Sequence, residues 1–283
     1  MSLKEFEGTK THVIMKGAGG RSFSIGRDMT DILVNPLSEV KDRFRSEFRS
    51  FYLIANYKKP YIAFIDGLCL GGACGFAMCG KYRVATERSI VAMPETSVGF
   101  FGASGSSYYL SRLRRNVGIY LAMTGQRLRG FDLKKIGLAT HFVETKKQKA
   151  LIKDLEQIVD RSDDVAKMLA NYSAIPMTME TEFDHHIPRI EECFDAGSVE
   201  EIYENLKKDG SKWAKETIAA LNQKSPTSLK VCHRQLYLGK MLTWKQCLKV
   251  SAGSSDDQVS KTHFFNFFRW NLGSRFITSL RVI

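Results

Sequence analysis

The chain has 283 residues, 43% of them hydrophobic, so it can bury a sizeable core as one large domain or two smaller ones. It has no run of about 18 apolar residues, so no transmembrane helix and no membrane partner are expected. The formal net charge of +12 favours anionic partners such as nucleic acid, phosphorylated cofactors or acidic lipid. The basic residues are scattered, however, and a solvated basic face is the simpler interpretation.

The beginning of the chain and the cysteines bear on the compartment. The first residues, MSLKEFEGTK, lack the apolar segment of a secretory signal, and their two glutamates disfavour a transit peptide. The cysteines form no C-x-x-C pair and lie mostly in apolar surroundings (Cys69, Cys74, Cys79, Cys193, Cys232 and Cys247). We therefore expect reduced, buried thiols of an intracellular protein, not a disulfide framework or a zinc site.

Strands alternate with helices in the first half of the chain. Short apolar runs predict strands over residues 11–17 and 60–66, and two more within 82–93. Helices are expected over 37–57, from Gly71-Gly72, and near 105–113 and 116–124. The helix over 37–57 has an apolar stripe made by Phe44, Phe48, Phe51 and Ala55. This alternation predicts an α/β fold with a buried, largely parallel sheet.

The pattern changes after a last strand expected at 138–144. Only helical periodicity is present from about 146 to 250, with Gly210 as a C-cap and Ser225-Pro226 as a helix start. From 251 the sequence becomes polar and then aromatic, and fits neither a helix nor a strand. We therefore divide the chain into a core (1–145), a helical region (146–250) and a divergent tail (251–283).

Two glycine-rich loops follow predicted strands. In DGLCLGGACGFAM (66–78), glycines allow close backbone approach, and a helix N-terminus directs free N–H groups at negative charge, as in an oxyanion hole. The alternative is a tight strand–helix turn without function. The second loop is GAGGRSFSIGRDM (17–29). Together the loops offer two N–H donors to one carbonyl oxygen, from Arg27 and Gly72.

Two glutamates are candidate functional carboxylates. Glu47 lies on the apolar stripe of the helix over 37–57, where a carboxylate is costly to bury. Its alternative role is a stripe-edge residue that reaches water or pairs with Arg43 or Lys58. Glu95 follows Pro94 at a strand end, a typical catalytic position. Its alternative role is a first-turn glutamate favoured by the helix dipole.

The histidines do not form a persuasive catalytic arrangement. His12 and His141 fall within strand-like runs, so we expect them to be packed and not catalytic. His185 and His186 lie in a helical region without a ligand partner one turn away, so no metal site is expected.

Several segments together resemble the crotonase (enoyl-CoA hydratase/isomerase) superfamily. The matching segments run from residue 13 to about 250, and include VIMKGAGGRSFSIGRDM, KKPYIAFIDGLCLGGACGFAMCGKYRVATER, VAMPETSVGFF, LAMTGQRLRG and VEEIYENLKKDG. KYRVATER with MPET is similar to the branch that hydrolyses 3-hydroxyisobutyryl-CoA in valine catabolism. The resemblance implies repeated ββα turns, two roughly perpendicular sheets and a helical C-terminal region.

The resemblance also implies an activity, which is hydrolysis of a short-chain acyl-CoA thioester. Arg27 and Gly72 match the backbone oxyanion donors, and Glu95 matches the catalytic carboxylate that attacks the thioester or activates water. Glu47, Gly72, Glu95 and the position of Ala103 match substrate-binding residues. No cofactor is expected, because coenzyme A is part of the substrate. The superfamily further implies a mitochondrial location and a homo-oligomer such as a trimer or hexamer.

The sequence departs from the family pattern at three places. The family reads GLFPD-V-G after the catalytic glutamate, whereas this chain reads GFFGASG, with Gly102 for the proline and Ala103 for the aspartate. Losing that carboxylate is expected to slow the reaction, and Ala103→Asp to restore rate. Arg27 puts a long cation where a small residue is usual. The family's first strands are not in this sequence, and its closing segment is replaced by the aromatic tail.

These departures keep a second function open. A weakened homologue can act as a scaffold, and relatives occur in the mitochondrial small ribosomal subunit, where the +12 charge would suit RNA. Nucleic acid is a partner only in that alternative. A hydratase is disfavoured, because hydratases of the superfamily have a second glutamate three residues after the oxyanion glycine, where this chain has Gly75.

Overall fold

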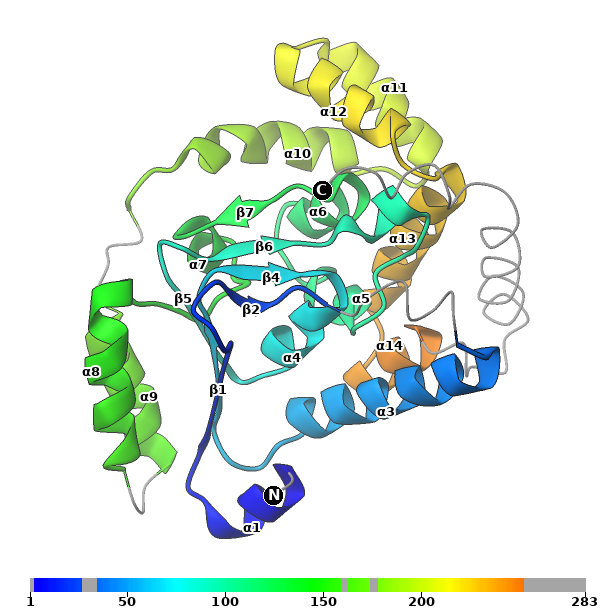
Figure 1. Ribbon diagram of the computed structural model, residues 1–283. Helices are drawn as coiled ribbons and strands as arrows, with labels where there is room; N and C mark the ends of the chain where they lie inside the picture. The colour runs from blue at the N-terminus through cyan, green and yellow to red at the C-terminus, as the bar shows by residue number, and fades with distance from the viewer. Residues whose placement is uncertain (1–2, 27–34, 159–161, 174–177, 252–283) are drawn as a thin grey trace.

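The computed structural model describes most of the chain, in four stretches: residues 3–26, 35–158, 162–173 and 178–251. Arg27 and the tail from 252 lie outside these residues. The strands form two four-stranded sheets that run in clearly different directions (Figure 1). The first sheet has the order β1-β3-β5-β8, and the second has the order β2-β4-β6-β7.

Every neighbouring pair of strands is parallel except β6 and β7. The strands of the first sheet are β1 (Val13–Lys16), β3 (Tyr61–Ile65), β5 (Tyr82–Ala85) and β8 (His141–Phe142). Those of the second sheet are β2 (Ser22–Ser24), β4 (Leu68–Leu70), β6 (Ile90–Ala92) and β7 (Leu128–Arg129). The α/β fold with largely parallel sheets is therefore confirmed.

The chain repeats one unit three times: a strand in the first sheet, a strand in the second sheet, and then a helix. The helical parts of the three units are α3 (Leu37–Ala55), η1 with α4 (Gly71–Ala73 and Cys74–Met78), and η2 (Pro94–Val98). This is the expected ββα repetition. The sequence-based expectation missed β2, β4 and β7, and treated 17–29 and 66–78 as loops. These strands have two or three residues, too few to produce a recognisable period.

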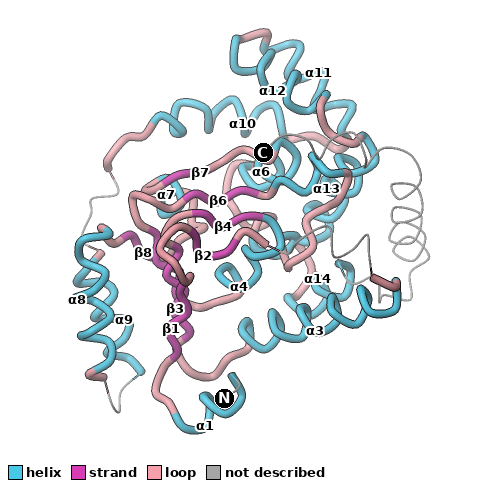
Figure 2. Tube along the Cα trace, viewed as in Figure 1, coloured by secondary structure: helices cyan, strands magenta, loops and turns pink. Residues whose placement is uncertain are grey.

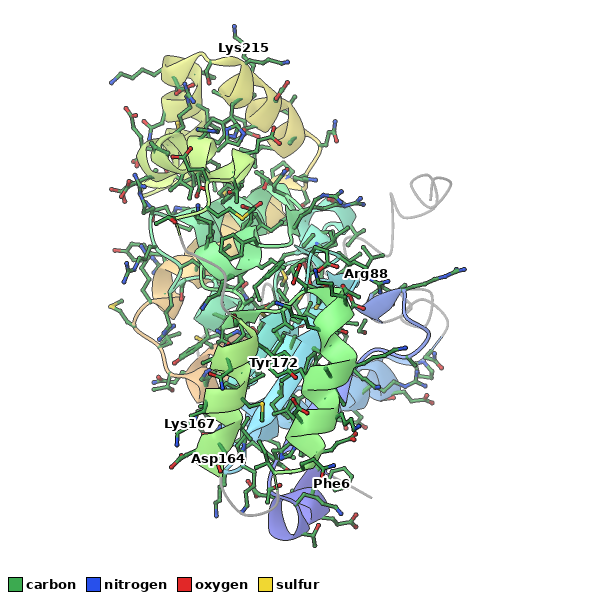
Figure 3. All side chains as sticks on the ribbon, turned by 90° about the vertical axis from the view of Figure 1, so that its left-hand side faces the viewer. Phe6, Arg88, Asp164, Lys167, Tyr172 and Lys215 are labelled. Atoms are coloured by element: carbon green, nitrogen blue, oxygen red, sulfur yellow. The ribbon has the colours of Figure 1, made fainter. Side chains whose placement is uncertain are left out.

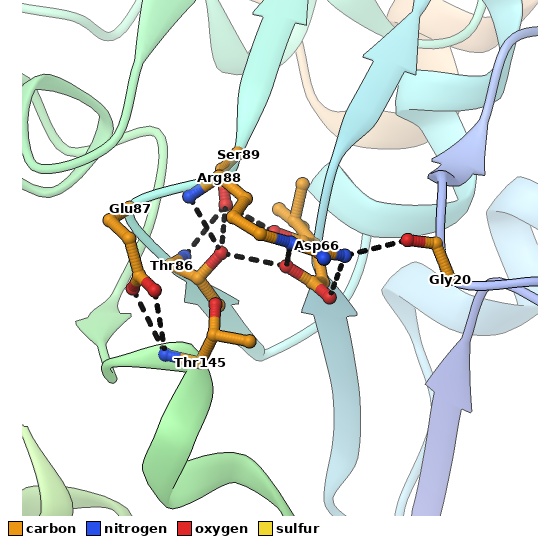
Figure 4. A network of polar contacts seen from close by, with 8 residues as sticks. Gly20, Asp66, Thr86, Glu87, Arg88, Ser89 and Thr145 are labelled. Atoms are coloured by element: carbon orange, nitrogen blue, oxygen red, sulfur yellow. Dashed lines mark hydrogen bonds and ion pairs between the residues drawn. The ribbon is translucent and has the colours of Figure 1, made fainter.

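A polar network joins the turns between the paired strands (Figure 4). The Arg88 guanidinium donates to both Asp66 carboxylate oxygens, at 3.0 and 2.7 Å, and to the Gly20 carbonyl oxygen at 2.7 Å. Thr86 Oγ1 also donates to Asp66, at 2.9 Å. Asp66, directly after β3, therefore has a structural role, because its ion pair with Arg88 helps to tie together the β1–β2, β3–β4 and β5–β6 turns.

Helices cover both faces of the first sheet. On β3, Ile62 and Phe64 pack in one cluster with the helices α8 (Thr145–Glu156) and α9 (Ser162–Tyr172), which stand side by side in Figure 3. Ala63 and Ile65 belong instead to the main core. Because side chains alternate along a strand, consecutive residues of β3 serve the two faces, and all five are buried.

The aromatic stripe of α3 reaches this main core. Phe44 stacks on Phe48, and Phe51 meets the ring of Phe76 edge-on with the ring centroids 4.9 Å apart. The helix expected over 37–57 is therefore confirmed, with its apolar side facing inward. This orientation matters for the site, because Glu47 lies on the same helix between Phe44 and Phe48.

The described residues from Thr145 to Ser251 contain helices and no strand (Figure 2). After α9 come η3 (Glu182–His186), α10 (Ile187–Phe194), α11 (Val199–Asp209), α12 (Lys212–Asn222), α13 (Pro226–Gly239) and α14 (Trp244–Ser251). Gly210 caps α11 in a left-handed conformation, and the Ser225 side chain caps α13, as expected. Four short helices complete the described elements: α1 (Leu3–Thr9), α5 (Ser106–Tyr109), α6 (Val117–Thr124) and α7 (Asp132–Lys135).

Two further features concern compartment and partners. All six cysteines are free and buried, in agreement with the expectation of reduced thiols. Among the residues that the structure describes, no helix has both the length and the apolar character that crossing a bilayer requires.

Candidate active site

The site is built around the turn at Gly71 and Gly72, where β4 ends and η1 begins. Gly71 has a φ of +57°, a left-handed conformation that glycine adopts without strain. A Cβ atom at Gly71 would lie 3.5 Å from Glu95 Oε1. One at Gly72 would lie 3.3 Å from Ser104 Oγ and 3.7 Å from Glu47 Oε1. Three polar side chains from separate elements thus converge on this glycine pair.

Glu95 reaches the turn from η2, which starts at Pro94 directly after β6. Its side chain is only 8% exposed, and neither carboxylate oxygen has a hydrogen-bond partner among the described residues. Burial raises the pKa of Glu95 from 4.5 to about 7. Glu95 is in the first turn of η2, but the helix dipole alone does not account for a buried, unpartnered carboxylate.

Glu47 approaches from α3. The helix buries Phe48 and Phe51 beneath it and presents the half-buried Glu47 side chain to Gly72. The sequence-predicted set of Glu47, Gly72 and Glu95 is therefore brought together in space. These residues lie far apart along the chain, so their convergence is the main argument for a functional site.

The loop 17–29 also reaches the glycine turn. Its last described residue is Gly26, and a Cβ atom there would lie 3.4 Å from the Leu70 carbonyl oxygen and 3.9 Å from the Gly72 nitrogen. The two glycine-rich loops therefore meet, as expected. Arg27, the predicted second oxyanion donor, lies outside the described residues, and its role stays a prediction.

The turn after Glu95 contains Ala103, at the position where the family pattern has an aspartate. Ala103 is 6% exposed and belongs to the apolar core, while its carbonyl oxygen accepts a hydrogen bond of 3.2 Å from Ser251 Oγ. The next residue, Ser104, is 2% exposed and faces Gly72. Sequence reasoning missed Ser104. The only signal was a hydroxyl next to the position where the family has its aspartate.

The histidines lie outside this site. Burial, with nearby Lys134 and Arg83, lowers the pKa of His141 to about 4, and its ring packs against Tyr82. Burial also lowers the pKa of His12. The expectation that His141 is packed is confirmed. His12 lies one residue before β1 and contacts Thr11.

A large cavity is present elsewhere in the molecule. It has a volume of about 820 Å³, and its walls include Tyr61, Arg83, Tyr109 and Arg112. None of Glu47, Gly72, Glu95 and Ser104 lines it. The convergence of polar groups on the glycine turn, and not cavity size, therefore identifies the candidate site.

The arrangement suits chemistry at a carbonyl carbon. A backbone N–H at the start of a helical turn stabilises negative charge on an oxygen. A carboxylate with a pKa near 7 is poised to accept a proton from water at neutral pH. No group of three or more potential metal ligands occurs within the described stretches.

Comparisons with known proteins identify the family of the chain. A family model described as enoyl-CoA hydratase/isomerase matches residues 3–272. The mitochondrial 3-hydroxyisobutyryl-CoA hydrolase of Rattus norvegicus is 42% identical over 250 residues, covering 84% of this chain and 64% of the rat protein. The hydrolase of Danio rerio is 42% identical over 266 residues, covering 91% of this chain and 69% of its own.

A solved structure with the same fold is also similar to this chain. A carnitinyl-CoA dehydratase from Mycobacterium thermoresistibile superposes with a TM-score of 0.81 at 26% identity, covering 94% of this chain and 80% of its own. The chain spans less than two thirds of the length of the rat relative, at 64%. By the extent of these matches, the chain belongs to the enoyl-CoA hydratase/isomerase family.

Proposed function

We propose that the protein hydrolyses a short-chain acyl-CoA thioester, and that its substrate is 3-hydroxyisobutyryl-CoA, which yields 3-hydroxyisobutyrate and coenzyme A. One observation carries this proposal: the buried carboxylate of Glu95 has no hydrogen-bond partner among the described residues and lies beside Gly71. A carboxylate that is shielded from water, beside a glycine turn that can stabilise an oxyanion, is suited to catalyse attack on the carbonyl carbon of a thioester. The names of the rat and zebrafish relatives, at 42% identity, support the same reaction.

In this mechanism the thioester carbonyl oxygen accepts hydrogen bonds from the backbone N–H groups of Gly72 and Arg27. The Glu95 carboxylate removes a proton from a water molecule, whose oxygen attacks the carbonyl carbon. The tetrahedral intermediate then breaks its C–S bond, and the CoA thiolate receives the proton from Glu95. In the alternative route, Glu95 attacks the carbonyl carbon itself and water hydrolyses the resulting anhydride.

Hydration of an enoyl-CoA is a weaker candidate. A second carboxylate would be needed at Gly75, but a Cβ atom there would lie 2.6 Å from two atoms of the Phe51 ring. That distance is too short for a side chain unless the ring moves. The local packing therefore favours a site with one buried catalytic carboxylate.

The remaining properties follow from this assignment. No separate cofactor is required, since coenzyme A arrives as part of the substrate. The mitochondrial relatives support a mitochondrial location for this protein. The net charge of +12 is suited to the phosphates of coenzyme A. A homo-oligomer is expected because members of the superfamily usually form trimers or hexamers.

The test is thiol release from 3-hydroxyisobutyryl-CoA by the wild-type protein and by Glu95→Gln. We expect turnover by the wild type and almost none by the variant. Glu204→Gln, in an exposed ion pair of α11, is the matched control and should keep full activity. Undetectable wild-type turnover, or turnover insensitive to Glu95→Gln, would overturn the proposal. Salt-sensitive co-sedimentation with mitochondrial small ribosomal subunits would then support the scaffold alternative.

A further inference from the structure

The large cavity at the amino ends of β3 and β5 has no role in the proposed reaction. Its walls include Tyr61, the first residue of β3, and Arg83, the second residue of β5. Its volume of about 820 Å³ is typical of pockets that hold small molecules. Because neither Gly72 nor Glu95 lines it, a ligand in this cavity would leave the candidate active site free.

The walls of the cavity are strongly basic. The basic side chains that line it are Lys59, Lys81, Arg83, Arg112, Arg114, Arg115 and Lys135. Among the described residues of these walls, Asp184 is the one acidic residue. Lys135 pairs with Asp184, and Arg115 pairs with Glu191 at 2.6 Å. The other basic side chains of the walls have no carboxylate partner in the described part of the chain.

Two of these unneutralised side chains are held in place by the backbone. Arg83 donates to the carbonyl oxygens of Leu138 and Gly80, at 2.6 and 2.9 Å. Arg112 also donates to backbone carbonyl oxygens, and its guanidinium carbon lies 3.6 Å from the centroid of the Tyr108 ring. A carbonyl group has a dipole but no net charge, so it orients a guanidinium without neutralising it. Both guanidinium groups are therefore preorganised to attract an anion.

The remaining three cations of the walls come from separate segments. Lys59 precedes β3, Lys81 precedes β5, and Arg114 follows α5. None of them makes a hydrogen bond or an ion pair with a described residue. Like charges that converge on one concave surface repel one another, and a bound anion removes this repulsion. Several unneutralised cations around one cavity call for a ligand with more than one negative charge.

We propose that this cavity binds a small polyphosphate anion, a chain of two or three phosphoryl groups that is either free or part of a nucleotide. Guanidinium groups recognise phosphate oxygens with paired hydrogen bonds, and lysine ammonium groups add charge. The concave shape favours a small molecule over a nucleic acid strand, which follows an extended groove. The proposal goes beyond the thioesterase function and does not depend on it.

The test is isothermal titration calorimetry with inorganic tripolyphosphate and the full chain. The cavity variant combines Lys59→Gln, Lys81→Gln and Arg114→Gln. It should fold like the wild type, because these side chains make no hydrogen bond within the described chain. Its dissociation constant for tripolyphosphate should be larger than that of the wild type by about 10-fold or more. No binding by the wild type, or equal affinity of the two proteins, would overturn the proposal.

The matched control combines Lys149→Gln, Lys153→Gln and Lys215→Gln. These lysines of α8 and α12 are exposed, have no ion pair with a described residue and do not line the cavity. The control therefore loses the same net charge from other parts of the surface, and it should keep the wild-type affinity. If it lost as much affinity as the cavity variant, the anion would be attracted only by the net charge of +12, and the proposal would be wrong.

Three further titrations identify the ligand and separate its site from the active site. Tripolyphosphate should still bind in the presence of saturating coenzyme A, whereas displacement by coenzyme A would place the anion in the substrate site and overturn the proposal. Tighter binding of ATP than of tripolyphosphate would support a nucleotide, and equal binding would support an inorganic chain. A single-stranded RNA that bound more tightly than both, and lost its affinity in the cavity variant, would overturn the assignment of a small ligand.

Discussion

The ring of Phe51 occupies the space that a side chain at Gly75 would need, because a Cβ atom at Gly75 would lie 2.6 Å from Phe51 Cε1. Gly75→Ala should therefore lower the free energy of unfolding by about 1–3 kcal/mol, the usual cost of overpacking a core. Gly75→Glu should cost more and should not create hydration of a short enoyl-CoA, because its carboxylate has no room. Urea unfolding and an enoyl-CoA hydration assay measure the two effects.

Gly8→Ala is the control for this prediction. Gly8 lies in α1 with nothing within 4 Å of its Cβ position, so alanine there should be neutral or slightly stabilising. If Gly75→Ala proved as harmless as Gly8→Ala, Phe51 would not be fixed against the glycine. The packing around Gly75 would then no longer exclude the second carboxylate that a hydratase needs.

The activity should follow the ionisation of Glu95. Since its pKa is raised to about 7, kcat/KM for the thioester should rise with pH and level off above about 7. Glu95→Gln should lower kcat by about 10²- to 10⁴-fold, as expected for loss of a general base. The residual activity of this variant should no longer rise with pH as that of the wild type does. A profile that is flat between pH 5 and 8 would contradict the role of Glu95.

The sequence predicted those parts of the molecule that are specified by short stretches of neighbouring residues. The α3 stripe follows from helical spacing, and the resemblance located Glu47, Gly72 and Glu95 because each lies in a recognisable segment. Ser104 could not be predicted, since its direction depends on tertiary packing. A Cβ atom at Gly105 would meet Trp244 of α14 at 2.5 Å, so the path of this turn depends on a helix almost 140 residues away.

The buried Glu95 should also make stability depend on pH. Between its ordinary pKa of 4.5 and its raised pKa of about 7, the unfolded chain releases a proton that the folded protein keeps. The free energy of unfolding therefore falls as pH rises through this window, by up to roughly 3 kcal/mol. Glutamine resembles the neutral form, so Glu95→Gln should be nearly as stable as the wild type at pH 5 and more stable at pH 8.

Urea unfolding of both proteins at these two pH values is the measurement. Other titrating groups are shared, so the difference between wild type and variant isolates Glu95. The same stability difference at pH 5 and pH 8 would mean that the Glu95 carboxylate is not desolvated in the folded protein. The role of Glu95 as a base near neutral pH would then need another explanation.

Ala103→Asp has two opposing expected effects. The resemblance predicts a higher rate, because it restores the carboxylate that the family has at this position. The packing predicts lower stability, because Ala103 is 6% exposed within the apolar core and a carboxyl group there must be desolvated. We expect a gain in kcat per folded molecule and a loss of about 1–3 kcal/mol in the free energy of unfolding. Turnover normalised to the folded fraction, measured from the unfolding curve of the same sample, separates the two effects. A stability loss without any gain in rate would mean that the missing aspartate does not limit the rate.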